Sequence, residues 1–144
     1  MREQMKQQHW SRSNVFPVFN ISVPQHNQEF VVLEGDDSLL FGPGRSSSSY
    51  FPGDLGTVVI HANYHFSFLQ NINLNDQIIL NDQMGAEYQY CVHDVSIIDL
   101  DKTQIEISEI DELKLVTPWP FDDFTKDNTL RYVVTCRKYE TYQN

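Results

Sequence analysis

Short runs rich in β-branched and aromatic residues, separated by turn-forming residues, constrain the fold of this chain more than any other feature. The run at 86–98 shows the pattern clearly, because Tyr88, Tyr90 and Val92 alternate with polar residues, a period of two that is typical of a strand with one buried face. Further runs of this kind occur at 19–23, 29–33, 56–61, 76–82, 103–107, 112–117 and 129–139. Short strands in this number predict an all-β barrel or sandwich.

The chain has the length of one domain. It contains 144 residues, of which 40% are hydrophobic, and this suits a single core. We expect residues 1–18 to form a polar tail or a short helix and residues 19–144 to form the β domain. Within that domain we expect a short helix at 62–70, where apolar residues three apart share a face, and a surface loop at 41–54, which is rich in Gly, Pro and Ser.

Charge and cysteine content exclude several classes of function. Twenty acidic and ten basic residues give a net charge of -10, which repels phosphate backbones, so nucleic acid is not expected as a partner. No apolar run approaches the length of about 18 residues that spans a bilayer, and we expect this chain to be soluble. Cys91 and Cys136 are too few for a disulfide framework and lack zinc-type spacing, so we expect two free thiols.

Four segments carry a resemblance to a known family. They are ISVPQHNQEFVVLEGDDSLLFGPG (21–44), FPGDLGTVVIHANYHFSFL (51–69), LKLVTPWPFDD (113–123) and TLRYVV (129–134). In order and spacing they resemble the sortases, in particular the group found in Gram-negative proteobacteria. The resemblance implies an eight-stranded sortase-like β-barrel with one or two short helices. It also implies cysteine transpeptidase chemistry, in which a sorting signal of a surface protein is cleaved between Thr and Gly and its acyl group is passed to an amine.

The resemblance assigns three positions to this reaction. His61 takes the place of the family's histidine, which acts as acid or base, and Arg131 takes the place of the arginine that donates hydrogen bonds to the substrate or the developing oxyanion. Pro118 stands where the family has its nucleophilic cysteine. Because a proline side chain has no nucleophilic atom, we expect the covalent step to be lost.

Three residues around Pro118 are candidates for a substrate groove, namely Thr117, Trp119 and Phe121. The two aromatic side chains either form a wall along which a peptide lies or fold back onto the barrel. The sequence leaves both arrangements open.

Cys136 offers an alternative nucleophile, because the segment around it also reads V-x-T-C. This interpretation makes the chain an active cysteine transpeptidase that uses Cys136 with His61 and Arg131. It requires the Cys136 sulfur to lie within reach of the His61 ring. Arg131 and Cys136 are five residues apart, so in a strand without a bulge their side chains point to opposite faces.

A metal site is a further alternative. His61 and His65 are four residues apart and share a face if this segment is helical, with His93 or Asp94 as further ligands. Because the pair has no clear third ligand, and His65 also matches the second histidine of the family segment, we expect no metal and no cofactor. We interpret the acidic residues between Asp94 and Glu112 as a solvated edge, since they lack the spacing of a calcium loop.

The sequence thus predicts a catalytically inactive sortase-like domain that is retained as a peptide-binding or accessory module. The expected partner is the sorting-signal peptide of a surface protein. From the resemblance alone, we expect it at the periplasmic face of the inner membrane, held by an N-terminal anchor that this chain lacks.

Overall fold

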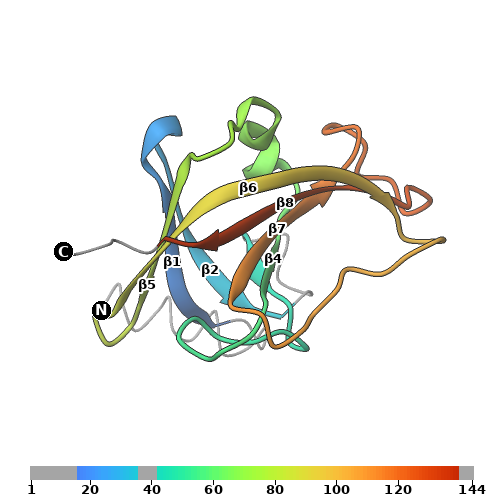
Figure 1. The fold of residues 1–144 in the computed structure, drawn as a ribbon. Coiled ribbons are helices and arrows are strands. Elements are labelled where there is room, and N and C mark those ends of the chain that lie inside the picture. Colours follow the sequence, from blue (N-terminus) through green and yellow to red (C-terminus); the bar gives the residue numbers. More distant parts are fainter. Residues whose placement is uncertain (1–15, 36–41, 140–144) are drawn as a thin grey trace, which may run out of the picture.

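The computed structural model describes residues 16–35 and 42–139. Within them, eight strands close into a barrel in the order β1-β2-β3-β4-β7-β8-β6-β5, and β5 pairs back onto β1 (Figure 1). The β2–β3 and β4–β7 pairs are parallel and the others are antiparallel. The strands are β1 (Pro17–Val23), β2 (Gln28–Glu34), β3 (Gly44–Arg45), β4 (Val58–His61), β5 (Gln77–Asp82), β6 (Glu87–Asp99), β7 (Glu112–Pro118) and β8 (Leu130–Lys138). The predicted all-β, eight-stranded barrel is confirmed.

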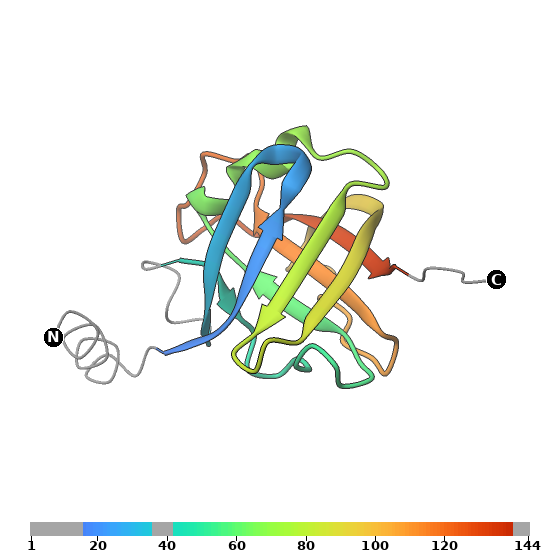
Figure 2. The same ribbon diagram turned by 90° about the vertical axis from the view of Figure 1, so that its left-hand side faces the viewer.

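Among the described residues, two short 3-10 helices lie at one end of the barrel (Figure 2). The helix η1 (Pro24–His26) connects β1 to β2, and η3 (Tyr64–Asn71) follows β4. The second overlaps the helix predicted at 62–70, although it begins two residues later and ends one residue later, and its apolar residues Phe66 and Leu69 are buried as that pattern indicates. The described part of the chain contains no helix that is long and apolar enough to cross a membrane.

The structure corrects the prediction at two segments. The run at 103–107 is not a strand but an irregular segment between β6 and β7, and the predicted loop at 41–54 contains the two-residue strand β3. The first strand begins at Pro17, two residues before the predicted start of the domain. Of the predicted tail or helix at 1–18, residues 1–15 lie outside the described residues.

Alternation along the strands divides apolar side chains between two faces of the barrel wall. The inner face carries the main core, in which Ile60 from β4, Leu115 from β7 and Val134 from β8 are fully buried. Val59, Val116 and Val133 are the residues next to these, so their side chains point to the outer face, where they form a second apolar cluster. We call this second group the outer cluster.

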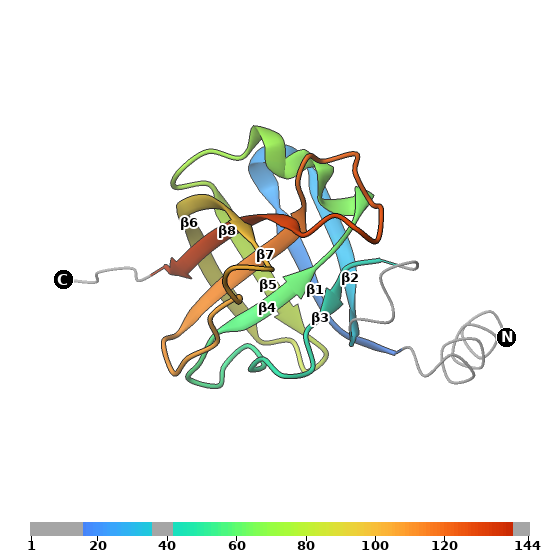
Figure 3. The ribbon, with the colours of Figure 1, turned by 90° about the vertical axis from the view of Figure 1, so that its right-hand side faces the viewer.

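The segment between β6 and β7 covers the outer cluster. Ile105 and Ile107 pack against it, and Figure 3 shows the segment running over the face of β7 and β4. Hydrogen bonds fasten it there, since the Thr57 backbone N–H donates to the Ser108 carbonyl at 3.0 Å and Lys114 Nζ donates to the Glu106 carbonyl at 3.0 Å. These contacts explain why the prediction of a strand at 103–107 was wrong, because the two isoleucines that alternate in this run are partly buried against an existing sheet.

An ion pair that the sequence did not reveal fixes the loop after β3. Arg45 is 3% exposed, and its Nε and Nη2 donate to the two carboxylate oxygens of Glu34 at 2.8 and 2.5 Å. Its Nη1 also donates to the Ser49 carbonyl at 2.6 Å, and the Phe51 ring covers the guanidinium at 3.8 Å. The buried charge is therefore paired and hydrogen-bonded, which burial of an arginine requires.

Candidate functional site

Strand register brings His61, Pro118 and Arg131 to the same end of three neighbouring strands. His61 ends β4 and pairs with Val116 of β7, while Pro118 ends β7 and pairs with Arg131 of β8. In its own strand, each of the three residues alternates with residues whose side chains point inward. Their side chains therefore point to the outer face, which also carries the outer cluster. The three positions that the resemblance selected thus lie together in space.

The Arg131 side chain is hydrogen-bonded to backbone carbonyls at the start of β8. Its Nη1 donates to the carbonyls of Asn128 at 2.9 Å and of Leu130 at 2.8 Å. Partial burial lowers the pKa of the guanidinium, which nevertheless stays protonated at neutral pH because it starts from 12.5. Nε and Nη2 of Arg131 make no hydrogen bond to any described residue, so within this part of the chain these two donors have no partner.

Asn128 organises the connection between β7 and β8, and the sequence analysis did not identify it. Its Nδ2 donates to the carbonyls of Trp119 at 3.0 Å and of Asp123 at 2.8 Å, and its Oδ1 accepts from the Leu130 backbone N–H at 2.9 Å. The backbone carbonyl of the same residue holds Arg131. An asparagine in a polar turn just before a strand is a signal for such side-chain capping, but it does not reveal which groups are capped.

The three predicted groove residues divide into a buried threonine and an aromatic cluster. Thr117 is 1% exposed, and its hydroxyl donates to the Asn63 carbonyl at 3.2 Å, so in this conformation it offers no surface to a peptide. Trp119 stacks on Tyr132 with ring centroids 5.7 Å apart, and Phe121 packs edge-on to Trp119 at 5.1 Å. Phe121 and Tyr132 also pack against the main core. The aromatic rings therefore fold back onto the end of the barrel while staying partly exposed.

His65 lies on η3 among aromatic side chains. Its ring stacks on Tyr64 at 4.0 Å and meets Phe30 edge-on at 5.6 Å. Burial lowers the pKa of His65, and its Nδ1 is buried without a hydrogen-bond partner in the described structure. Both observations indicate a neutral ring set among aromatic side chains.

The residues considered for a metal site are not gathered. His93 and Asp94 belong to β6, and β8 and β7 lie between that strand and β4, which carries His61. Among residues 16–35 and 42–139, no group of three or more His, Cys, Asp or Glu side chains has a metal-binding arrangement.

Cys136 does not lie beside His61. It is 0% exposed and belongs to the main core on the inner face of β8, whereas Arg131 lies on the outer face. The β7–β8 register has no shift between them, so the alternation argument holds. At about 3.3 Å per residue, the five-residue separation is also about 16 Å along the strand. The geometry that the alternative nucleophile requires is therefore not present, and burial raises the pKa of the thiol well above its usual value.

The comparisons with known proteins give the family. Residues 21–139, which are most of the chain, match the family model described as "Sortase domain". The chain belongs to the sortase family. No curated protein matches the sequence significantly.

Solved sortases share the fold at low sequence identity. Sortase A from Corynebacterium diphtheriae is 20% identical with a TM-score of 0.75, and the alignment covers 90% of this chain and 63% of that one. Sortase C1 of GBS Pilus Island 1 is 18% identical with a TM-score of 0.70, covering 88% and 66%. A sortase D5 transpeptidase from Clostridium perfringens is 17% identical with a TM-score of 0.73, covering 96% and 89%. The chain thus spans less than two thirds of the length of the first two relatives.

Proposed function

We propose that this sortase domain binds a peptide at the surface around His61 and Arg131, beside the buried Pro118, and that it forms no acyl-enzyme there. The observation that carries the proposal is the position of Pro118, which ends β7 directly opposite Arg131 and on the same face as His61. The residue type at this position decides whether a covalent step can occur.

No thiol lies at this surface, because both cysteines of the chain lie elsewhere. The chain has two cysteines, and both are described. Cys136 is enclosed in the core, and Cys91 lies on β6, where it pairs with Arg137 and where β8 and β7 separate it from β4. The Thr117 hydroxyl is buried and already donates to a carbonyl. His61 therefore has no cysteine nearby with which it could exchange a proton.

Peptide binding is supported by the groups that remain. A half-buried guanidinium with donors directed to no described residue is suited to a peptide carbonyl, and hydrogen bonds from a charged donor are about twice as strong as neutral ones. Two residues along β8 from Arg131, Val133 belongs to the outer cluster and borders a cavity of about 340 Å³ that Ile98 and Ile105 also line. Its other lining residues are polar, and they include two carboxylates and Lys114, so the cavity offers a polar side chain of a bound peptide a place along β8 from the arginine.

The partner and location in this proposal come from the resemblance. We propose a sorting-signal peptide as the ligand, the proteobacterial group as the branch of the family, and the periplasmic face of the inner membrane as the place of action. Fractionation of cells that express the native gene tests the location, because recovery in the cytoplasm contradicts it.

A peptide panel tests the binding and the chemistry together. Fluorogenic peptides that contain a Thr-Gly bond are incubated with the protein, with and without an amine acceptor, and binding is followed by fluorescence anisotropy. We expect saturable binding without cleavage, and Arg131→Ala is expected to weaken binding about tenfold. Arg137→Ala, which removes an exposed arginine near the other end of β8, is the matched control. Thiol-dependent cleavage by the wild-type chain that is lost in Cys136→Ala contradicts the proposal and supports the active alternative.

A further inference from the structure

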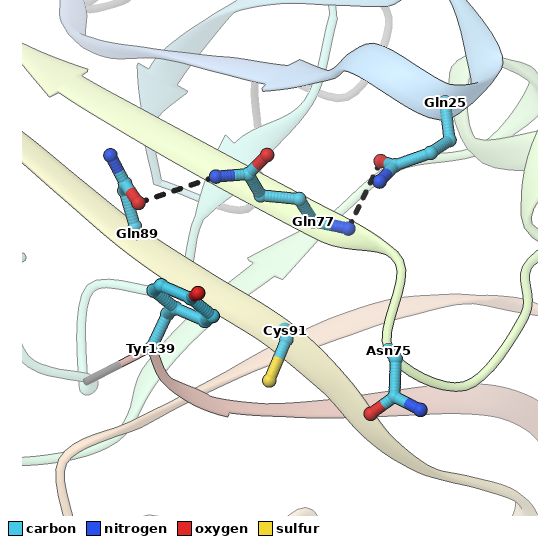
Figure 4. A pocket seen from close by; sticks show the side chains of 6 residues that line it. All are labelled: Gln25, Asn75, Gln77, Gln89, Cys91 and Tyr139. Carbon is cyan, nitrogen blue, oxygen red and sulfur yellow. Dashed lines mark hydrogen bonds between the residues drawn. The ribbon is translucent and has the colours of Figure 1, made fainter. Parts of the chain in front are cut away.

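A second cavity lies on another part of the barrel wall, over β5 and β6. It has a volume of about 330 Å³ and is lined by Gln25, Asn75, Gln77, Gln89, Cys91 and Tyr139 (Figure 4). β8 and β7 separate β6 from β4 in the barrel, so this cavity is distinct from the surface around His61. We call it the amide pocket, because four of its six residues carry a side-chain carboxamide.

The frame of the amide pocket is fixed by hydrogen bonds between its segments. The Asn75 backbone N–H donates to the Val92 carbonyl at 2.8 Å, and the Tyr139 backbone N–H donates to the Gln89 carbonyl at 2.8 Å. The Gln25 side chain accepts from the Gln77 backbone N–H at 3.0 Å, which Figure 4 shows as a dashed line. Each contributing segment is therefore tied to β5 or β6, and the pocket is formed before a ligand arrives.

Several polar atoms of the pocket have no partner within the described residues. Gln77 Nε2 donates to Gln89 Oε1 at 3.3 Å, which leaves Gln77 Oε1 free as an acceptor. Gln25 Nε2 and both ends of the Asn75 amide make no hydrogen bond to residues 16–35 or 42–139. The pocket thus presents donors and acceptors side by side, which carboxamides supply and carboxylates do not.

The lining carries no formal charge although a fifth of the chain is charged. A phosphate or carboxylate ligand finds no cationic side chain in the lining and meets a protein of net charge -10. A cationic ligand finds no carboxylate in the lining to pair with. The chemistry therefore selects a neutral ligand that both donates and accepts hydrogen bonds.

Tyr139 adds an apolar surface to this polar set. Its side chain stands at one side of the pocket, and the residue is 49% exposed, so part of the aromatic ring is open to a ligand. A sugar ring has hydroxyl groups that donate and accept, and a face of C–H groups that packs on aromatic rings. We propose that the amide pocket binds a neutral saccharide, with the carboxamides on its hydroxyl groups and Tyr139 against its C–H face.

Titration with sugars, followed by ¹H–¹⁵N NMR of the side-chain amide groups, tests the proposal. The probes are glucose, mannose, galactose and the β-1,4-linked dimer of N-acetylglucosamine, and glucuronic acid is the charged comparison. We expect saturable shifts of the Gln25, Asn75, Gln77 and Gln89 amide signals with at least one neutral sugar. We expect Tyr139→Ala and Gln77→Leu each to weaken that binding about tenfold, which corresponds to about 1.4 kcal/mol.

Controls separate this outcome from loss of folding and from the proposed peptide site. Gln70→Leu removes an exposed carboxamide on η3, outside the pocket, and is expected to leave sugar binding unchanged. Arg131→Ala is also expected to leave it unchanged, so failure of one proposal is distinguishable from failure of the other. The spectrum of each variant shows whether it is folded. Absence of saturable shifts with every neutral sugar overturns the proposal, as does binding that survives Tyr139→Ala and Gln77→Leu or a preference for glucuronic acid.

Discussion

Pro118 and Arg131 are paired directly across the β7–β8 ladder, so their side chains share the outer face of the barrel wall. His61 joins them through the parallel pairing of β4 with β7, which places it beside Val116. Strand register alone therefore assembles the three positions. The same alternation directs Cys136 into the core, away from that face.

Asn128 is expected to stabilise the β7–β8 connection and to position Arg131. Asn128→Ala removes two hydrogen bonds donated by Nδ2 and one accepted by Oδ1, and we expect the free energy of unfolding to fall by about 2 kcal/mol. Asn128→Asp keeps the acceptor for the Leu130 N–H, so its free energy of unfolding should fall by less. Urea unfolding followed by circular dichroism measures both variants, with Asn73→Ala as the control, because the Asn73 side chain makes no hydrogen bond to residues 16–35 or 42–139. A loss below about 0.5 kcal/mol for Asn128→Ala contradicts this role.

The Glu34–Arg45 pair is expected to show strong coupling. Glu34→Ala leaves the enclosed Arg45 guanidinium without its carboxylate, and we expect a loss of about 3 kcal/mol in the free energy of unfolding. In a chain that already carries Arg45→Leu, the Glu34→Ala change should lower the free energy of unfolding far less. A double-mutant cycle by urea unfolding measures this coupling, and additive losses would show that the two side chains act independently.

The two thiols are expected to differ sharply in reactivity. Cys91 is partly exposed, whereas Cys136 is enclosed and burial raises its pKa, so the reactive thiolate is scarce at Cys136. A disulfide-exchange reagent at neutral pH should therefore modify Cys91 alone in the native protein and both cysteines in urea. Cys91→Ser should make the native chain unreactive. Rapid native modification of Cys136 would show that its thiol reaches solvent without unfolding.

His65 is expected to make stability depend on pH. Its native pKa lies below the usual 6.5 because the ring is buried, whereas in the unfolded chain it titrates near 6.5. Between these two values the unfolded state binds more protons, so the free energy of unfolding falls as pH is lowered through this window and is unaffected by His65 above it. His65→Phe removes the dependence.

The His65 prediction is measured as a difference. The free energy of unfolding of His65→Phe minus that of the wild type should increase as pH falls from about 7.5 to about 5.5. A constant difference for His65→Phe would mean that the native ring titrates as it does in the unfolded chain.

The sequence predicted much of the barrel, because alternation along a strand is visible one residue at a time. Tyr90 and Val92 were assigned to one face of β6, and both are buried in the core. The run at 103–107 misled the analysis, since Ile105 and Ile107 alternate for burial against the outer cluster and not for pairing in a sheet. The sequence pattern records which side chains are buried but not what buries them.

The candidate site was predictable where it depends on strand ends and not where it depends on loops. His61, Pro118 and Arg131 were selected by resemblance, and the register brings them together. Asn128 and the Glu34–Arg45 pair were missed because their partners are backbone carbonyls or residues of another segment, which only the folded chain brings within reach.

Covalent trapping tests the central claim most directly. The protein is incubated with a peptide that contains the Thr-Gly bond and no amine acceptor, and intact mass spectrometry detects any acyl group left on the chain. All variants carry Cys91→Ser, which removes the partly exposed thiol, and Pro118→Cys serves as the positive control that returns a thiol to the end of β7. We predict an acyl adduct on the Pro118→Cys variant and none on the chain with Pro118. An acyl adduct on Cys136 of the chain that retains Pro118 would contradict the account.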